Sequence, residues 1–151
     1  MNQGGYQTFY TNSANEHPSI PFLIAPIDGS IQSNLTPNFY WTESLDPDPL
    51  DHVSYIMSYE VNNSGIWFDI NADTNWYLPE LNLSDNSMFK WNVHSMDLNG
   101  SDSFSDSSVF YTDEFSEPPG NFSTVFPLDL SVHDQSEIHF IWNNSFDPDP
   151  I

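Results

Sequence analysis

Acidic residues are the side chains in this sequence whose spacing could support chemistry. Asp46-Pro47-Asp48-Pro49 places two carboxylates two residues apart, and the same tetrapeptide returns at residues 147–150. Each proline fixes its own φ near roughly −65° and keeps the preceding aspartate extended, so alternate carboxylates can face one point. Carboxylates held so close repel one another unless a cation lies between them. Because oxygen-only ligands suit calcium and not a transition metal, both loops are candidate calcium sites.

The overall charge excludes two classes of partner. The chain carries 22 Asp and Glu against one basic residue, Lys90, for a formal net charge of −21. Nothing here can neutralise phosphates, which excludes nucleic acid, and adsorption to anionic membranes fails for the same reason. No apolar run is long enough for membrane insertion. Cysteine is absent, so the fold cannot rely on disulfides.

The two acidic tetrapeptides belong to a longer repeat. A shift of 101 residues aligns residues 9–50 with residues 110–151 at 15 identical positions, among them Trp41 with Trp142. Such self-similarity predicts a tandem array with a period of about 101 residues. We expect the last strand of a preceding repeat (or an N-terminal donor strand) at 1–13, a linker at 14–17, a complete domain at 18–113, a linker at 114–117, and the first strands of an incomplete repeat at 118–151.

Within the complete domain, the apolar pattern indicates strands and no helices. Apolar residues alternate with polar ones over 53–61 and 89–93, and such alternation is typical of half-buried strands. Further short strands are expected at 39–41, 66–70, 21–25, 76–78 and 107–112. Turn residues separate them, so the sequence predicts an all-β, seven-stranded antiparallel Greek-key β-sandwich.

The order of motifs in residues 18–113 resembles a fibronectin type III domain of the microbial extracellular kind. The motifs are Pro26–Ser30, Trp41, Asp46–Asp48 followed by Val53–Tyr55, Leu81, Phe89–Val93 and Asp97–Ser101. One departure is that Phe89 stands where the family usually has the tyrosine of its tyrosine corner. The resemblance implies a non-catalytic module of an extracellular or cell-surface protein.

The same topology lets us assign metal ligands at each junction between repeats. The loops 44–52 and 97–102 should lie at the end of the sandwich that faces the preceding repeat. At the first junction we expect the ligands Asp46, Asp48, Asp51, Asp97, Asp102 and Glu16, and at the second Asp147, Asp149, Asp113, Glu114 and Glu117. Calcium there would clamp successive domains together. The alternative is a solvated acidic turn, since Asp and Pro are ordinary turn residues.

The terminal segments are too short to hold cores of their own. Either the natural polypeptide continues beyond Ile151, or a second copy supplies missing strands head-to-tail by β-augmentation. In the second case, residues 1–11 of the neighbouring copy would supply only one of the five strands that the incomplete repeat at 118–151 lacks.

The Asn-Xaa-Ser/Thr acceptor sites allow two interpretations. They are Asn34, Asn62, Asn82, Asn99, Asn121 and Asn143. They indicate either attached glycans on an extracellular protein or simply a surface rich in Asn and Ser.

Signals for catalysis are missing. The five histidines show no zinc spacing, His94 is expected on a strand's outward face, and no nucleophile motif occurs. We therefore expect no enzyme but a self-associating extracellular structural protein, a calcium-stiffened array that forms a surface stalk or filament. Alternatives are a carbohydrate-binding or accessory module of a secreted enzyme, with Trp67 and Tyr40 as outward aromatics, and a cell-surface adhesin.

Overall fold

The computed structural model describes residues 5–72, 74–77 and 83–150. These residues form strands and no helix. In chain order the strands are β1 (Leu23–Ala25), β2 (Ser30–Gln32), β3 (Phe39–Trp41), β4 (Ser54–Val61), β5 (Trp67–Ala72), β6 (Trp76–Tyr77), β7 (Ser87–Met96), β8 (Asp102–Phe104), β9 (Ser108–Thr112), β10 (Thr124–Phe126) and β11 (Ile141–Trp142).

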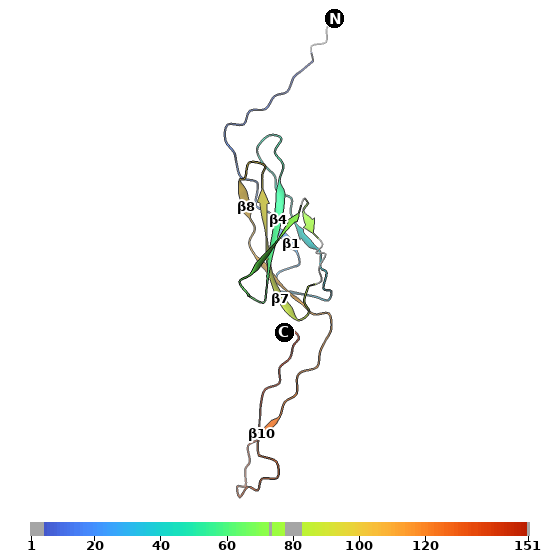
Figure 1. The fold of residues 1–151 in the computed structure, drawn as a ribbon, viewed down its shortest axis with the longest axis vertical. Helices are drawn as coiled ribbons and strands as arrows, with labels where there is room; N and C mark the ends of the chain where they lie inside the picture. The colour runs from blue at the N-terminus through green and yellow to red at the C-terminus, as the bar shows by residue number, and fades with distance from the viewer. Residues whose placement is uncertain (1–4, 73, 78–82, 151) are drawn as a thin grey trace.

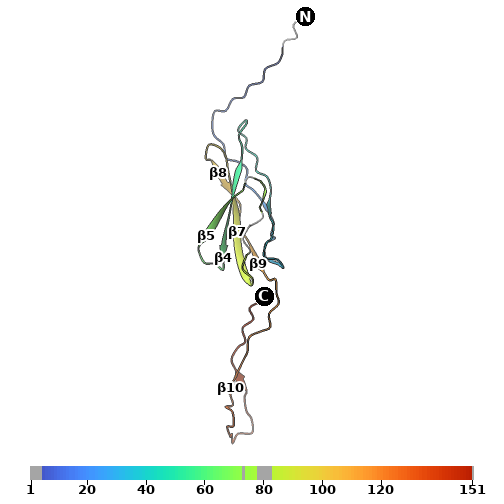
Figure 2. The ribbon, with the colours of Figure 1, turned by 45° about the vertical axis from the view of Figure 1, so that its right-hand side comes forward.

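The larger sheet of the central domain has the order β2-β9-β7-β4-β5, and β8 pairs with β7 beside it. The long strands β4 and β7 form its centre, antiparallel and in register from Ser54 opposite Met96 to Val61 opposite Phe89 (Figure 2). Along β7 every second residue is buried, from Ser87 to Ser95. This alternation is what a sheet with one face on the core requires.

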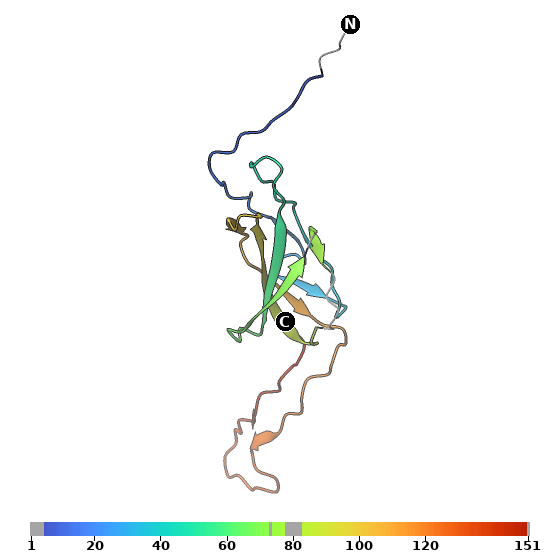
Figure 3. The ribbon, with the colours of Figure 1, turned by 45° about the horizontal axis from the view of Figure 1, so that its top comes forward.

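A smaller sheet of order β1-β3-β6 covers the inner face of the larger one, in a sandwich-like arrangement (Figure 3). Aromatic rings fill the space between them. Phe39 on β3 meets Trp91 edge-on at 5.0 Å between ring centroids, and Phe110 on β9 at 5.7 Å. The buried hydrophobic core comprises Phe39, Trp41, Tyr55, Met57, Ala72, Leu83, Phe89, Trp91, Val93 and Phe110.

Within residues 18–113 the expected strands are present, with differences at the short elements. Seven strands coincide with the expected ranges to within a few residues: β1, β3, β4, β5, β6, β7 and β9. The short strands β2 and β8 were not expected. After β1 the chain turns at Gly29, whose φ is +72°, and crosses to the other sheet, where β2 pairs parallel to β9. The expectation of a wholly antiparallel sandwich is corrected at this pair.

No tyrosine corner forms at Phe89. Its ring is buried and stacks on Phe110 with the centroids 5.3 Å apart. A different tyrosine ties the backbone: the hydroxyl of Tyr55 on β4 accepts a hydrogen bond from the backbone N–H of Ser44 over 2.7 Å. Leu81 and Asn82 lie outside the described residues.

The terminal segments extend from opposite ends of the central domain (Figure 1). Residues 5–13 are exposed and form no strand. Residues 118–150 form a long hairpin-like excursion in which β10 pairs with β11. Its pairing repeats that of β1 and β3 at an offset of 101 residues: Leu23 faces Trp41, and Thr124 faces Trp142.

Candidate metal centre

The acidic loop of the central domain is shaped by its two prolines. Asp46 Oδ1 accepts the backbone N–H of Asp48 at 2.8 Å, and the N–H of Asp51 reaches the carbonyl of Asp48 at 3.3 Å. Pro49 and Leu50 occupy the two central positions of this turn. Leu50 has a φ of +66°, a conformation that glycine adopts easily and leucine does not. The turn brings the third carboxylate back to the first two.

The three aspartates of this loop form a cluster. Asp46, Asp48 and Asp51 each offer one carboxylate oxygen, and these oxygens lie within 4.8 Å of one another. It is the one such cluster of metal-ligating side chains among the described residues. Asp48 is buried, with 5% of its surface exposed. Carboxylates so placed repel one another strongly unless a cation shares them.

Two buried oxygens at this loop lack partners. Neither Asp46 Oδ2 nor Ser44 Oγ has a hydrogen-bond partner among the described residues. Both residues line a cavity of about 410 Å³, which Asp51 and His52 also line. Because an unpaired buried carboxylate oxygen is costly, the donor set fits a hard cation such as calcium, which oxygen ligands alone can hold.

Neighbouring elements hold the loop in place. The loop 97–101 contacts Asp51, whose two oxygens accept the N–H of Leu98 and the side-chain amide of Asn99, each at 3.2 Å. The two loops therefore meet at the same end of the sandwich, as the topology predicts. On the other side, the Tyr55 hydroxyl fixes Ser44 at the start of the acidic loop.

The linker before the domain also docks on the cluster. The backbone N–H of Glu16 donates to Asp48 Oδ2 over 3.2 Å. The pKa of Glu16 is raised because its carboxyl group shares a hydrogen bond with that of Asp48, and further by some loss of hydration and by the charges of Asp48 and Asp46. Glu16 therefore lies beside the cluster of Asp46, Asp48 and Asp51, although the cluster itself does not include it.

Asp97 and Asp102 stay outside the cluster. Asp97 Oδ1 accepts the backbone N–H groups of Asn99 and Ser101, both at 2.8 Å, so this carboxylate closes its own loop. Burial opposes its ionisation, but these bonds and one from Asn15 outweigh burial and lower the pKa of Asp97. Asp102 Oδ2 instead meets His94 Nε2 at 3.1 Å.

The second junction repeats the linker contact. The backbone N–H of Glu117 donates to Asp149 Oδ1 over 3.1 Å, and Asp147 Oδ1 accepts the N–H of Asp149 at 3.2 Å. Asp113 lies beside them: burial, and then the charges of Asp149, Asp85 and Asp147, raise its pKa. Glu114 donates its backbone N–H to Asp85 over 2.8 Å. Carboxylates from the central domain and from residues 118–150 therefore face one another.

Sequence reasoning missed the residues that position these carboxylates. At the second junction the Asn86 amide donates to Glu117 over 3.0 Å. That bond lowers the pKa of Glu117, but the bond shared with Asp149, partial burial and nearby charges outweigh it, so the pKa is raised. At the first junction the Asn15 amide reaches Asp97 at 3.0 Å. The signal in the sequence would have been asparagines close to the acidic residues, because their side-chain amides can donate hydrogen bonds to carboxylates that repel one another.

The remaining candidate sites are simpler. The Lys90 ammonium lies over the outward-facing Trp67 ring, 5.9 Å from its centre, so the lysine side chain covers one face of this ring. His94, on an outward position of β7, stacks on Phe104 at 4.2 Å between ring centroids.

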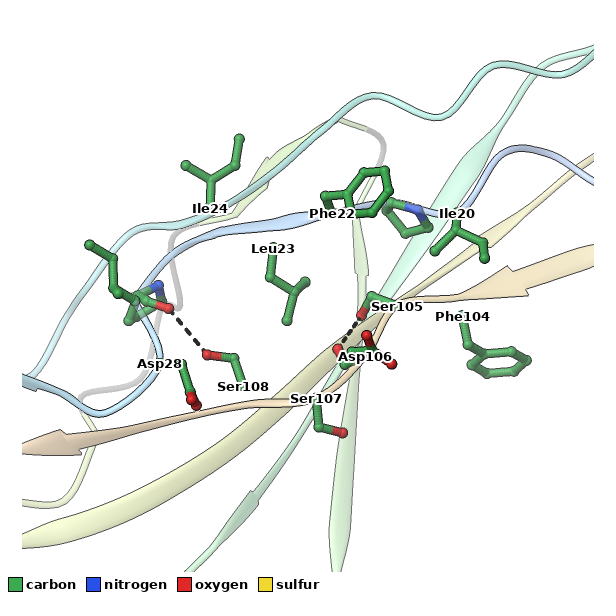
Figure 4. Close-up of a pocket in the computed structure, with 13 residues that line it drawn as sticks. Ile20, Phe22, Leu23, Ile24, Asp28, Phe104, Ser105, Asp106, Ser107 and Ser108 are labelled. Atoms are coloured by element: carbon green, nitrogen blue, oxygen red, sulfur yellow. Dashed lines mark hydrogen bonds between the residues drawn. The ribbon is translucent and has the colours of Figure 1, made fainter.

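A groove lined mainly by apolar side chains runs between the segment around β1 and the connection from β8 to β9 (Figure 4). It has a volume of about 470 Å³ and is lined by residues 20–24, 26–28 and 104–108. Ile20 and Phe22 lie on one side, and Phe104 lies on the other. The lining contains no metal-ligating cluster of described residues.

Comparison with known proteins gives a resemblance in structure alone. No known protein family matches this chain, and no curated protein matches it. The chain is similar to the solution structure of the sixth fibronectin type III domain of human fibronectin type III domain containing protein 3. That comparison has 14% sequence identity and a TM-score of 0.46, and it covers 74% of this chain and 98% of the other. The described part of the chain contains no helix of the length and apolarity that a membrane crossing requires.

Proposed function

We propose that this chain acts as a non-enzymatic extracellular structural protein, a tandem array of fibronectin type III-like sandwiches that calcium stiffens at its junctions. Such an array would form a stalk or filament at a cell surface. Its function lies in length, shape and self-association. The carrying observation is that one linker contact occurs at both junctions, as the bond from Glu16 to Asp48 and the bond from Glu117 to Asp149.

Several further bonds support the repeat. The backbone N–H of Ser19 donates to the carbonyl of Leu45, and that of Gly120 donates to Phe146. Phe22 donates its N–H to the Thr42 hydroxyl, and Ser123 donates its N–H to the Asn143 amide oxygen. Each second pair lies 101 residues after the first, although the side chains that accept these bonds differ. A repeated backbone framework with changing surface residues is typical of repeat proteins.

Electrostatics support calcium at the junctions. Neighbouring carboxylates and burial raise the pKa values of Glu16, Glu117 and Asp113, although a backbone hydrogen bond at Glu16 and the Asn86 amide at Glu117 oppose the rise. Among the described residues the one ion pair, between His94 and Asp102, lies outside the Asp46 cluster. A divalent cation would turn this repulsion into attraction between domains. Extracellular calcium modules bind with Kd values of roughly 10⁻⁴–10⁻³ M.

Small-angle X-ray scattering tests whether calcium fixes the second junction. Calcium is expected to narrow the range of orientations between the central domain and residues 118–150. Asp149→Asn keeps an acceptor for the Glu117 N–H but removes a charge, so it should abolish that response. Asp134→Asn, at an exposed position, is the matched control. Identical scattering of the wild type with and without calcium would contradict the proposal.

A further inference from the structure

The groove beside β1 lies within the central domain, and hydrogen bonds close it at both ends. At one end the Ser103 hydroxyl donates to the carbonyl of Pro18 over 2.7 Å. At the other end the Gly29 N–H donates to the carbonyl of Val109, also over 2.7 Å. Between these bonds the two walls separate and leave a volume of about 470 Å³ (Figure 4). The groove is therefore part of the folded sandwich and not of the terminal segments.

The free edge of β1 forms one wall of this groove. Among the described residues β1 pairs with β3 and with no other strand. Phe22 donates its N–H to the Thr42 hydroxyl and accepts the N–H of Thr42 at its carbonyl. Because the direction of hydrogen bonding alternates along a strand, the N–H and carbonyl of Leu23 point away from β3. Pro21 has no N–H, so Leu23 is the residue of this edge that can pair fully with another strand.

The walls of the groove carry an exposed apolar patch. Five of its large hydrophobic side chains expose more than half of their surface: Ile20, Phe22, Ile24, Ile27 and Phe104. Leu23 points from β1 into the space between the walls (Figure 4). Single exposed apolar residues are common, but a group of them around one groove is typical of a binding surface. The patch and the free strand edge together fit an extended segment.

The charged side chains of the groove are both acidic. Asp28 and Asp106 line it, both are exposed, and neither forms an ion pair with a described residue. The one basic residue of the chain, Lys90, lies over the Trp67 ring instead. A second copy of this chain would bring a net charge of −21 to this negative groove. Charge complementarity therefore disfavours a second copy and favours a partner that carries positive charge.

We propose that this groove binds a short extended peptide of another protein, with apolar side chains at alternate positions and lysine or arginine beside them. One residue of the peptide pairs through its backbone with Leu23 and adds a strand to the sheet β1-β3-β6. Its apolar side chains cover Phe22 and its neighbours, and its basic side chain pairs with Asp106. This binding site goes beyond the structural role proposed above, and it does not depend on calcium at the junctions.

Peptide titration followed by amide NMR tests this site. The probe is a mixture of capped heptapeptides, Lys-Xaa-Thr-Xaa-Thr-Xaa-Lys, in which each Xaa is Val, Ile, Leu or Phe. We expect it to shift the amide signals of Leu23 and Asp106 in EGTA and in calcium alike. The same peptides with Glu in place of Lys, or with Ser at every Xaa, should leave these signals unchanged.

Three results of this titration would overturn the proposal. No shift at Leu23 with the lysine mixture would show that the groove does not bind such a peptide. An equal shift with the Ser peptides would reduce binding to adsorption on an acidic surface, and an equal shift with the Glu peptides would remove the role of charge. The calcium junction is judged by the response to calcium alone, so either proposal can fail without the other.

Two variants test the groove residues. Phe22→Ser and Asp106→Asn should each weaken binding of the lysine mixture several-fold, because they remove an apolar contact and a charge. Both side chains are exposed, so neither change removes a core residue. Phe115→Ser and Asp134→Asn are the matched controls at exposed positions outside the groove. Unchanged affinity in both groove variants would contradict this binding site.

Discussion

The backbone N–H of Glu16 lies 3.2 Å from a carboxylate oxygen of Asp48, so a linker residue is bound to a loop of the domain that follows it. The same contact joins Glu117 to Asp149 at 3.1 Å. In each case a second carboxylate, that of the glutamate itself, is brought into an already negative loop. Docking of the linker therefore adds negative charge to the acidic loop, and no basic side chain among the described residues forms an ion pair with it.

The first prediction concerns pH. The pKa of Glu16 is higher in the folded state than its ordinary value of 4.5, so the folded protein holds this proton to higher pH than the unfolded chain. Without calcium, stability should fall as the pH rises from about 4.5 through the raised pKa. Glu16→Gln removes this penalty, so its thermal midpoint should exceed that of the wild type at pH 7 and match it below pH 4.

Asp106→Asn is the control for this prediction, because it removes one charge from an exposed side chain. Its effect on the midpoint should vary less with pH than that of Glu16→Gln. If Glu16→Gln lowers the midpoint at pH 7 in the absence of calcium, the assignment of repulsion between Glu16 and Asp48 is wrong.

The second prediction concerns Tyr55→Phe. This change leaves the buried N–H of Ser44 without its acceptor, which should cost about 1–3 kcal/mol of unfolding free energy. It should also weaken the calcium response, since Ser44 begins the acidic loop. Urea unfolding with and without calcium measures both effects. Tyr59→Phe is the control, because the Tyr59 hydroxyl has no partner among the described residues. Equal stability of the two variants would contradict the role of Tyr55.

The third prediction concerns Phe89→Tyr. Fibronectin type III domains, which the sequence resembles, usually have tyrosine at this position, but the Phe89 ring is buried and stacks on Phe110. A new hydroxyl at this position should destabilise the domain by about 1–3 kcal/mol because it would be buried without a partner. Chemical denaturation measures the change, with Phe104→Tyr at an exposed position as the control. A gain in stability would show that a tyrosine corner can form.

The fourth prediction concerns glycosylation. The side-chain nitrogen of Asn99 donates to Asn15 at 3.1 Å and to Asp51 at 3.2 Å, and a glycan would replace one of its two hydrogens, so glycan attachment there would break at least one of these contacts. Asn34 and Asn121 are exposed at the surface. After secretion from a glycosylating host, peptide mass spectrometry should find glycans at Asn34 and Asn121 and none at Asn99. Full occupancy of Asn99 would contradict the docking of this loop.

The sequence predicted the long strands because their alternation is local. In β7 every second side chain is buried, and in β4 Tyr55, Met57, Tyr59 and Val61 pack in or against the core, so the period can be read from neighbouring residues. β2 and β8 have three residues each, too few to show a period. Their existence depends on partners far along the chain, Phe110–Thr112 for β2 and His94–Met96 for β8. The parallel pairing of β2 with β9 was unpredictable for the same reason.

The candidate site divides in the same way. Asp46, Asp48 and Asp51 come together because a proline-rich turn fixes them locally. Asp97 was assigned to the site from its loop, but its carboxylate satisfies the N–H groups of that loop. Asp85 was missed because the assignment relied on the match between residues 9–50 and 110–151, and Asp85 lies outside both ranges. Its loop approaches the second junction through contacts with Glu114 and Asp113. Spacing identifies a turn but does not show which way each carboxylate faces.

Calcium-dependent thermal unfolding of the wild type and Asp46→Asn tests the central claim most directly. Asparagine keeps the acceptor for the Asp48 N–H and removes one ligand charge. Calcium at ten times its Kd should stabilise the wild type by about 1.4 kcal/mol. The thermal midpoint should therefore rise with calcium and return to its calcium-free value in EGTA. Asp46→Asn should lose most of this rise, and magnesium should produce little of it. A wild-type midpoint that is the same in calcium and in EGTA would contradict the account.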